Sequence, residues 1–256
     1  MTVDRRIRPG LEICVDEPAG VVAALSGGAD RIELCSALAA GGLTPSTPLV
    51  EFSLGLAVPA GLKVHAMVRP RAGDFDYDST ELALAVQEAR ALIDVGVHGL
   101  VFGAVREGKI DARALANWVG AIRETSATVR LTLHRAIDVV EDPVGAVEVA
   151  IDLGFDYILT SGGATSAPAG VATIARMVER SADRCRIMAG AGLRAENAAI
   201  VLASGVQDLH ASASRARPAL PDAYNVLQLP APPRQTNVSE VGALRQVIEN
   251  EFSRRA

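Results

Sequence analysis

Two glutamates and two cysteines alternate in the first two apolar segments of the chain. Glu12 and Cys14 lie in LEICV, and Glu33 and Cys35 lie in RIELC. Side chains two residues apart in a strand point to the same face, so each pair would be presented together. Carboxylates transfer protons, whereas cysteine thiolates select soft ions such as copper(I). This spacing therefore favours either acid–base chemistry or a soft-metal site.

Histidines and arginines follow at the ends of later apolar segments. His210 and Ser212 share one face of DLHAS, and His134 ends LTLH. Guanidinium groups hold carboxylates and phosphates, and histidine transfers protons near neutral pH. We therefore expect a site for a small anion, with His134, Glu12 and Glu33 as candidate catalytic groups. The candidate substrate-binding side chains are Arg69, Arg71, Asp74, Arg135, Asp138, His210 and Ser212.

Glycine-rich segments supply further candidate anion-binding groups. Gly162 follows one apolar segment, and Gly190 and Gly192 follow another, directly before a predicted helix. Exposed backbone N–H groups at such a helix start bind phosphate or carboxylate, although tight-turn geometry alone also requires glycine. This segment also spells GxGxxA, but the next predicted strand ends in Ser212 instead of an acidic residue that would hold a ribose. We expect no nucleotide cofactor.

Eight strands separated by helical patterns would position these residues. Four of the helical patterns end in a glycine placed just before the next strand, which is typical of a left-handed helix stop. These glycines are Gly28, Gly96, Gly154 and Gly205. The predicted strands are Leu11–Val15, Arg31–Cys35, Lys63–Arg69, Gly99–Gly103, Val129–Arg135, Tyr157–Gly162, Arg184–Gly190 and Asp208–Ala213.

This alternation predicts the fold class α/β, and within it a (β/α)8 TIM barrel, because doubly wound sheets usually have fewer strands. We expect a single domain over residues 1–256, with an N-terminal extension over 1–10. An irregular, proline-rich loop over 214–237 precedes the last helix, whose apolar face is formed by Val241, Leu244, Ile248 and Phe252. In such barrels the chemistry lies at the C-terminal ends of the strands.

Composition excludes several classes of function. The net charge of −5 on 256 residues, without long runs of like charge, argues against nucleic-acid or anionic-membrane binding. Three cysteines cannot form a disulfide framework, and no signal-like apolar stretch follows the first arginines, so we expect a cytoplasmic protein without a membrane span. The lysines, Lys63 and Lys109, lie away from the strand C-termini, which argues against Schiff-base chemistry. We also expect a homodimer or higher homo-oligomer, as for barrels in general.

Several motifs in order resemble the CutC copper homeostasis family. They are LEICVDE, GGADRIELCSALAAGGLTPS, MVRPRAGDFDY, LTLHRAIDVVEDP, ILTSGG, IMAGAGLRAEN and LHASAS, between Leu11 and Ser214. The resemblance implies a cytoplasmic TIM barrel with a role in copper handling. It further implies copper(I) binding by Cys14 and Cys35, to which Met67 or His210 could add a third ligand. HRAID replaces the family's usual HRAFD, RPRAGDF replaces RPRGGDF, and the tail from Ala216 follows no family pattern.

Two interpretations of the function stay open at this point. The polar residues suit either a copper(I)-binding protein or a TIM-barrel enzyme that acts on a small anionic substrate. A structural alternative exists for each residue set: the cysteines could pack as small apolar side chains, and the charged groups could form a satisfied ion network. For His134 the sign of the pKa shift is open, because carboxylates would raise the pKa and arginines or burial would lower it.

Overall fold

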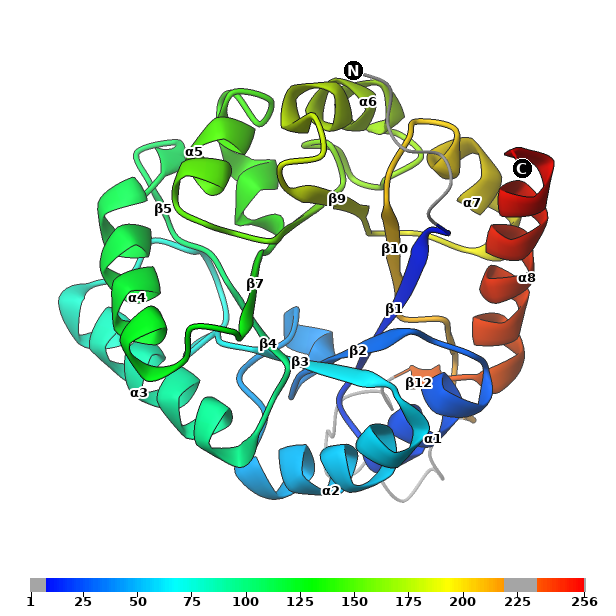
Figure 1. The fold of residues 1–256 in the computed structure, drawn as a ribbon, viewed down its shortest axis with the longest axis horizontal. Helices are drawn as coiled ribbons and strands as arrows, with labels where there is room; N and C mark the ends of the chain where they lie inside the picture. Colours follow the sequence, from blue (N-terminus) through cyan, green and yellow to red (C-terminus); the bar gives the residue numbers. More distant parts are fainter. Residues whose placement is uncertain (1–7, 219–233, 256) are drawn as a thin grey trace, which may run out of the picture.

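The computed structural model describes residues 8–218 and 234–255, whose eight central strands form a closed parallel barrel surrounded by helices (Figure 1). The strand order around the barrel is β1-β10-β9-β8-β7-β4-β3-β2, so the first and last barrel strands close the sheet. The predicted TIM barrel is confirmed. The barrel strands are β1 (Gly10–Val15), β2 (Arg31–Leu34), β3 (Lys63–Met67), β4 (Gly99–Phe102), β7 (Arg130–Leu133), β8 (Tyr157–Thr160), β9 (Arg186–Ala189) and β10 (Asp208–Ala211).

Each barrel strand is followed by a helix on the outer face of the barrel. The helices are α1 (Pro18–Ser26), α2 (Thr47–Ala57), α3 (Ser79–Val95), α4 (Ala112–Thr125), α5 (Ala146–Asp152), α6 (Val171–Ser181), α7 (Ala195–Leu202) and α8 (Val238–Arg255). Three 3-10 turns lie between them: η1 (Leu38–Ala40), η2 (Val58–Ala60) and η3 (Arg135–Val139). Within the described part of the chain, no helix is long and apolar enough to cross a membrane.

Local sequence signals account for where these elements start and stop. The four predicted glycine stops all adopt positive φ angles between 81° and 104°, which a residue with a side chain rarely adopts. The 17-residue helix α3 begins with a capping box in which Asp78 accepts from the Glu81 backbone and Glu81 accepts from the Asp78 backbone. These signals are local, which is why the sequence is sufficient to place most elements.

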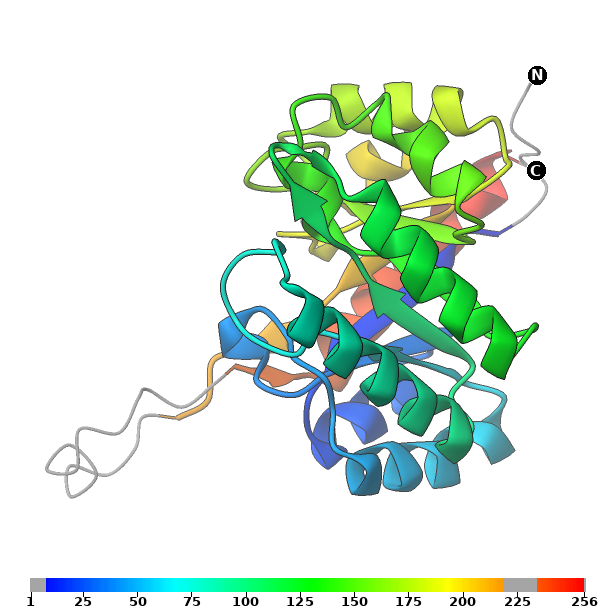
Figure 2. The same cartoon turned by 90° about the vertical axis from the view of Figure 1, so that its left-hand side faces the viewer.

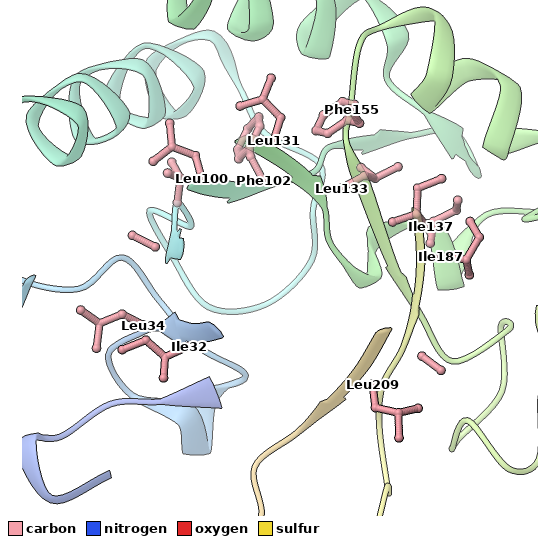
Figure 3. Packing of buried hydrophobic residues seen from close by; sticks show 14 of the residues in the cluster. Ile32, Leu34, Leu100, Phe102, Leu131, Leu133, Ile137, Phe155, Ile187 and Leu209 are labelled. Carbon is pink, nitrogen blue, oxygen red and sulfur yellow. The ribbon is translucent and has the colours of Figure 1, made fainter. Parts of the chain in front are cut away.

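The apolar core lies between the outer face of the barrel and the helices (Figure 3). Leu100 and Phe102 alternate with Val101 along β4, and the ring of Phe102 stacks on Trp118 of α4 with centroids 4.7 Å apart. Each such fully buried apolar side chain contributes about 1.5–3 kcal/mol to folding. Because the outward positions hold this core, the inward positions of the same strands are free to carry polar groups.

The segment 214–237 is less irregular at its ends than the sequence predicts. Two short strands, β11 (Ser214–Arg215) and β12 (Gln235–Thr236), pair antiparallel and lead into α8. Residues 219–233 of this predicted loop, and residues 1–7 of the predicted extension, lie outside the described residues. A second small hairpin, β5 (Val105–Arg106) with β6 (Lys109–Ile110), follows β4 and was not predicted. Of the predicted apolar face of α8, Val241, Leu244 and Ile248 are buried, and Phe252 is half-buried.

Candidate functional site

A cavity of about 550 Å³ opens at the C-terminal ends of the barrel strands. In Figure 2 this end lies on the left, on the same side as the loop that follows β3. A cavity of this size fits a small molecule. Eight of the predicted site residues line it, namely Cys14, Glu33, Arg69, His134, Arg135, Gly192, His210 and Ser212.

The cavity at the opposite end of the barrel has a different lining. It measures about 460 Å³ and is lined by Lys63, His65 and His98 among others, none of which was predicted as a site residue. Burial and neighbouring Arg31 lower the pKa of His65 to about 3. The predicted site residues that line a cavity are therefore gathered at the C-terminal end.

Glu12 lies beneath the mouth cavity and holds His210 in position. Its Oε1 accepts from His210 Nδ1 at 2.7 Å, and its Oε2 accepts from Arg31 Nε. Arg31 also lies 3.8 Å from Asp208, and its guanidinium stacks over the Tyr157 ring at 4.5 Å. Burial raises the pKa of Glu12, but Arg31 and His210 outweigh burial, so the pKa falls well below 4.5. Glu12 is thus an ionised carboxylate that does not line the mouth cavity.

Cys14, Glu33 and His210 converge above Glu12. One ligand atom from each lies within 4.8 Å of the other two, and all three residues are buried. The strand register explains the convergence, because Glu12 faces His210 across β1 and β10, while Cys14 faces Glu33 across β1 and β2. His210 Nε2 lies 3.8 Å from Glu33 Oε2, and Glu33 Oε1 has no hydrogen-bond partner among the described residues.

The charge states of this cluster follow from its neighbours. Burial would lower the pKa of His210, but Glu33, Cys14 and Glu12 outweigh burial and raise it well above 6.5. Burial also raises the pKa of Glu33 to about 7, although His210 acts in the opposite direction. At neutral pH the cluster therefore holds a protonated imidazole beside a carboxyl group that is close to its own pKa.

Cys35 lies next to this cluster but does not line the cavity. Its thiol donates to Glu33 Oε2 at 3.6 Å, and its side chain packs with Met67 and Val101 inside the barrel. Burial and the nearby Glu33 carboxylate raise the pKa of the Cys35 thiol well above 9.0. The third cysteine, Cys185, is a buried free thiol at the other end of the barrel wall.

His134 and Arg69 form a separate corner of the cavity. Phe75 packs against both, with its ring centroid 4.7 Å from that of His134 and 5.2 Å from the Arg69 guanidinium carbon. Burial and Arg69 lower the pKa of His134 to about 3. Glu12 and Glu33, which were expected to act with His134, lie beside His210 instead.

Besides Glu12, three predicted charged residues lie outside the cavity lining. Arg71 binds Glu81 and Asp74 in the loop before α3, and the Asp74 side chain is 74% exposed. The strand alternation that points side chains inward ends before this loop, which is why neither residue reaches the cavity. Asp138 accepts from Arg135 Nε at 2.8 Å and from the Ser161 backbone at 2.9 Å, so it clamps the end of β8 to η3.

The predicted glycines have mainly packing roles. A side chain at Gly162 would come within 2.5 Å of the Gly170 carbonyl oxygen, and one at Gly190 would come within 2.6 Å of Leu159. Gly192 lines the cavity with a φ of 67°, and its backbone N–H has no hydrogen-bond partner among the described residues. Only the loop around Gly192 therefore keeps the geometry expected of an anion-binding turn.

Two site residues could have been found from strand alternation and were missed. Arg31 has the same parity on its strand as Glu33, and Asp208 has the same parity as His210. Phe75 and Gly103 gave no such signal. Gly103 matters because a Cβ there would lie 2.7 Å from His134 Nδ1.

A family model of the CutC family matches residues 10–215, which contain all of these groups. The chain belongs to the CutC family. The CutC family protein of Rhizobium meliloti (strain 1021) is 44% identical over 245 residues, covering 94% of this chain and 97% of the relative. The CutC family protein of Caulobacter vibrioides (strain NA1000 / CB15N) is 45% identical over 204 residues, covering 79% of this chain and 80% of the relative.

Solved structures agree with this membership. The CutC structure from Streptococcus agalactiae, which carries the name copper homeostasis protein, has a TM-score of 0.74 and 27% identity, covering 80% of this chain and 98% of that one. A thiamine phosphate pyrophosphorylase from Pyrococcus furiosus has a TM-score of 0.60 at 17% identity, covering 96% of this chain and 98% of that one, and shows the barrel fold alone.

Proposed function

We propose that this CutC protein binds copper(I) as its cargo at the Cys14–Glu33–His210 cluster. Thiolate sulfur selects copper(I) and imidazole nitrogen is a common partner ligand. Cys14 and His210 supply these two donors within 4.8 Å of each other. Glu33 offers a buried oxygen without a partner, which is the kind of group that an ion would satisfy.

The single observation that carries this proposal is the hydrogen bond between Glu12 and His210. Metal-binding histidines usually donate their second ring N–H to a carboxylate, which fixes the tautomer and aims the other nitrogen at the metal. Glu12 accepts from His210 Nδ1 at 2.7 Å, which leaves Nε2 directed toward Cys14 and Glu33. Because Cys14 and His210 must both release a proton to bind a metal, copper(I) affinity is expected to increase with pH.

The proposal changes one ligand of the pair that the family resemblance implies. Cys14 is retained, and His210, which the resemblance allowed as a third ligand, replaces Cys35 as the second donor. Cys35 does not line the cavity onto which Cys14, Glu33 and His210 open. Its hydrogen bond to Glu33 and its packing with Met67 favour a structural role.

A competition titration of the reduced protein with a copper(I) chelator tests this ligand set. We expect Cys14→Ser and His210→Phe each to lose at least about tenfold in affinity, while Cys35→Ser changes it by less than about threefold. Equal losses for Cys14→Ser and Cys35→Ser, with none for His210→Phe, would restore the two-cysteine site. Zinc(II) titration of the same variants shows whether the cluster discriminates between the two ions.

A second candidate function rests on the opposite corner of the cavity. Arg69 is 6% exposed, and its guanidinium donates to backbone carbonyl oxygens, with no ion pair to a carboxylate among the described residues. A buried cation without a counterion favours a small anionic ligand. A cavity of about 550 Å³ also exceeds what a bare ion needs. We propose as the alternative an enzyme acting on a small carboxylate or phosphate, with Glu33 and His210 as the proton-transfer groups.

The location and the oligomeric state stay predictions. Three free, buried cysteines are consistent with the expected cytoplasmic location. The expected homodimer or larger homo-oligomer is tested by light scattering of the purified protein. A mass equal to one chain of 26.6 kDa would contradict it.

A further inference from the structure

Two buried hydrogen-bond donors in one corner of the mouth lack acceptors. Arg69 Nε and His134 Nε2 have no partner among the described residues, and both side chains line the mouth cavity. A buried donor without an acceptor is costly and rare in folded proteins. Both groups pack against Phe75, and the Tyr77 hydroxyl, which interacts with Arg69, is also unpartnered, so a ligand oxygen in this corner would supply an acceptor that the described residues do not.

The surroundings of His134 fix its ring as a permanent donor. Its Nδ1 accepts from the Ala136 backbone N–H at 3.2 Å at the start of η3, so the ring proton is on Nε2. Gly103 allows the ring to lie against the wall, because a Cβ there would approach Nδ1 within 2.7 Å. The pKa of about 3 keeps the imidazole neutral at physiological pH, so His134 donates a hydrogen bond and does not exchange protons.

The guanidinium of Arg69 is equally constrained. It donates to the carbonyl oxygens of Ala40, Gly42 and Gly73 at 3.0, 3.1 and 2.7 Å, which fixes its plane. These neutral acceptors come from η1 and from the loops after η1 and β3, and they leave its positive charge uncompensated. Fixed charges and dipoles of this kind bind an anion without further reorganisation.

We propose that Arg69 and His134 form an oxyanion subsite that binds one carboxylate or phosphate group of a small ligand. This inference deepens the second candidate function and rests on it. Phe75, which is half-buried and packs against both groups, is the side chain that turns aside to admit the ligand oxygen. The remainder of the ligand then occupies the cavity shared with Cys14, Glu33 and His210.

The subsite assigns different roles to the two mouth histidines. His210 belongs to the ionised cluster and can exchange protons, whereas His134 is a neutral donor that positions and polarises the bound group. Two other cavity-lining arginines have carboxylate partners, because Arg135 pairs with Asp138 and Arg215 pairs with Glu240, and Arg234 is exposed and donates to Ser214. Arg194 is exposed at the rim and provides a matched control for removing one positive charge from the same cavity.

Calorimetric titration of the metal-free protein with inorganic phosphate, and separately with acetate, tests the subsite. We expect Arg69→Gln to weaken binding of the preferred anion at least about tenfold, because it removes a charged donor. His134→Phe, which keeps a ring against Gly103 but removes the donor, should weaken it about threefold or more. Arg194→Gln should change it less than about twofold. The tighter of the two anions identifies the group as phosphate or carboxylate.

Imidazole NMR supplies a readout that a structural role would not change. The inference predicts that the bound anion shifts the Nε2–H signal of His134 in wild type. Shifts confined to the backbone amides of residues 191–193 would place the anion at the α7 loop and overturn the subsite. Equal anion affinity in wild type, Arg69→Gln and His134→Phe would also overturn it. If wild type binds neither anion, the second candidate function fails as well, whereas the copper(I) proposal is tested by its own titration.

Discussion

The two sides of the barrel mouth contain the same residue type in opposite electrostatic environments. On the β1–β2–β10 side, His210 lies between Glu12 and Glu33, and its pKa rises well above 6.5 although burial opposes this. On the β3–β7 side, His134 lies beside Arg69 under Phe75, and its pKa falls to about 3. Both side chains are buried, so burial alone does not decide the charge of a mouth histidine.

The position of a residue along its strand determines whether it reaches the mouth, whereas the residues on neighbouring elements determine its charge. β1 and β2 bring Glu12 and Glu33 to His210, and the 3-10 turn after β7 brings a backbone donor to His134 instead. One side can therefore bind a cation or transfer protons, and the other can bind an anion. Changes to either side should thus have distinct and separable effects.

The largest expected effect is on the free energy of unfolding, and it distinguishes Glu12 from Glu33. Glu12→Gln removes the counterion of the buried Arg31 and should lower the free energy of unfolding by about 3–5 kcal/mol. Glu33→Gln, at a carboxyl group with a pKa of about 7 and an unpartnered oxygen, should cost less than about 1 kcal/mol. Urea denaturation at pH 7 measures both values. Equal losses would mean that Glu33 is as much a part of the ion network as Glu12.

The pH dependence of stability should have opposite signs for the two histidines. His134 stays neutral in the folded state down to about pH 3, whereas the unfolded chain binds a proton below about pH 6.5, so its contribution is lost as pH falls from 6.5 toward 3. His210 contributes fully below pH 6.5 and loses its contribution as pH rises through its raised folded pKa.

Denaturation of wild type, His134→Phe and His210→Phe across pH 4 to 9 measures this contrast. Relative to wild type, His134→Phe should become less destabilising toward low pH and His210→Phe less destabilising toward high pH. For one proton, the free energy of unfolding changes by at most about 1.4 kcal/mol per pH unit. Slopes of the same sign would remove the proposed contrast between the two sides.

A smaller effect is expected at the wall behind His134. Gly103→Ala would place a Cβ 2.7 Å from His134 Nδ1, and the resulting displacement should cost about 1–3 kcal/mol. Gly120→Ala is the matched control, because a Cβ added at that position in α4 would meet no neighbouring atom within 4 Å. This substitution should raise the free energy of unfolding by about 0.5–1 kcal/mol. Thermal unfolding compares the two. If Gly103→Ala leaves the stability unchanged, the His134 imidazole is not held in place by this contact.

The sequence was sufficient for the fold because its signals are local. Apolar strands and the glycines before them predicted all eight barrel strands, and alternation along each strand correctly turned Glu12, Cys14, Glu33 and His210 inward. Alternation fails where a strand ends, which is why Arg71 and Asp74 were expected at the mouth and instead bind each other and Glu81.

The partners within the site could not be predicted in the same way. Glu12 and His210 are separated by 198 residues, and only barrel closure brings them opposite each other. Alternation gives the face of a residue but not its register against a neighbouring strand. The sequence therefore could not decide which histidine would receive the glutamates, or whether Cys14 would have Cys35 or His210 as its nearer donor.

X-ray absorption at the copper edge of the reduced, copper(I)-loaded protein tests the central claim most directly, because it reports which atoms surround the ion. We expect one sulfur, one imidazole nitrogen and one carboxylate oxygen, with the imidazole scattering absent from His210→Phe and the spectrum unchanged in Cys35→Ser. Two sulfur ligands without imidazole scattering, one of which is lost in Cys35→Ser, would contradict the Cys14–Glu33–His210 site.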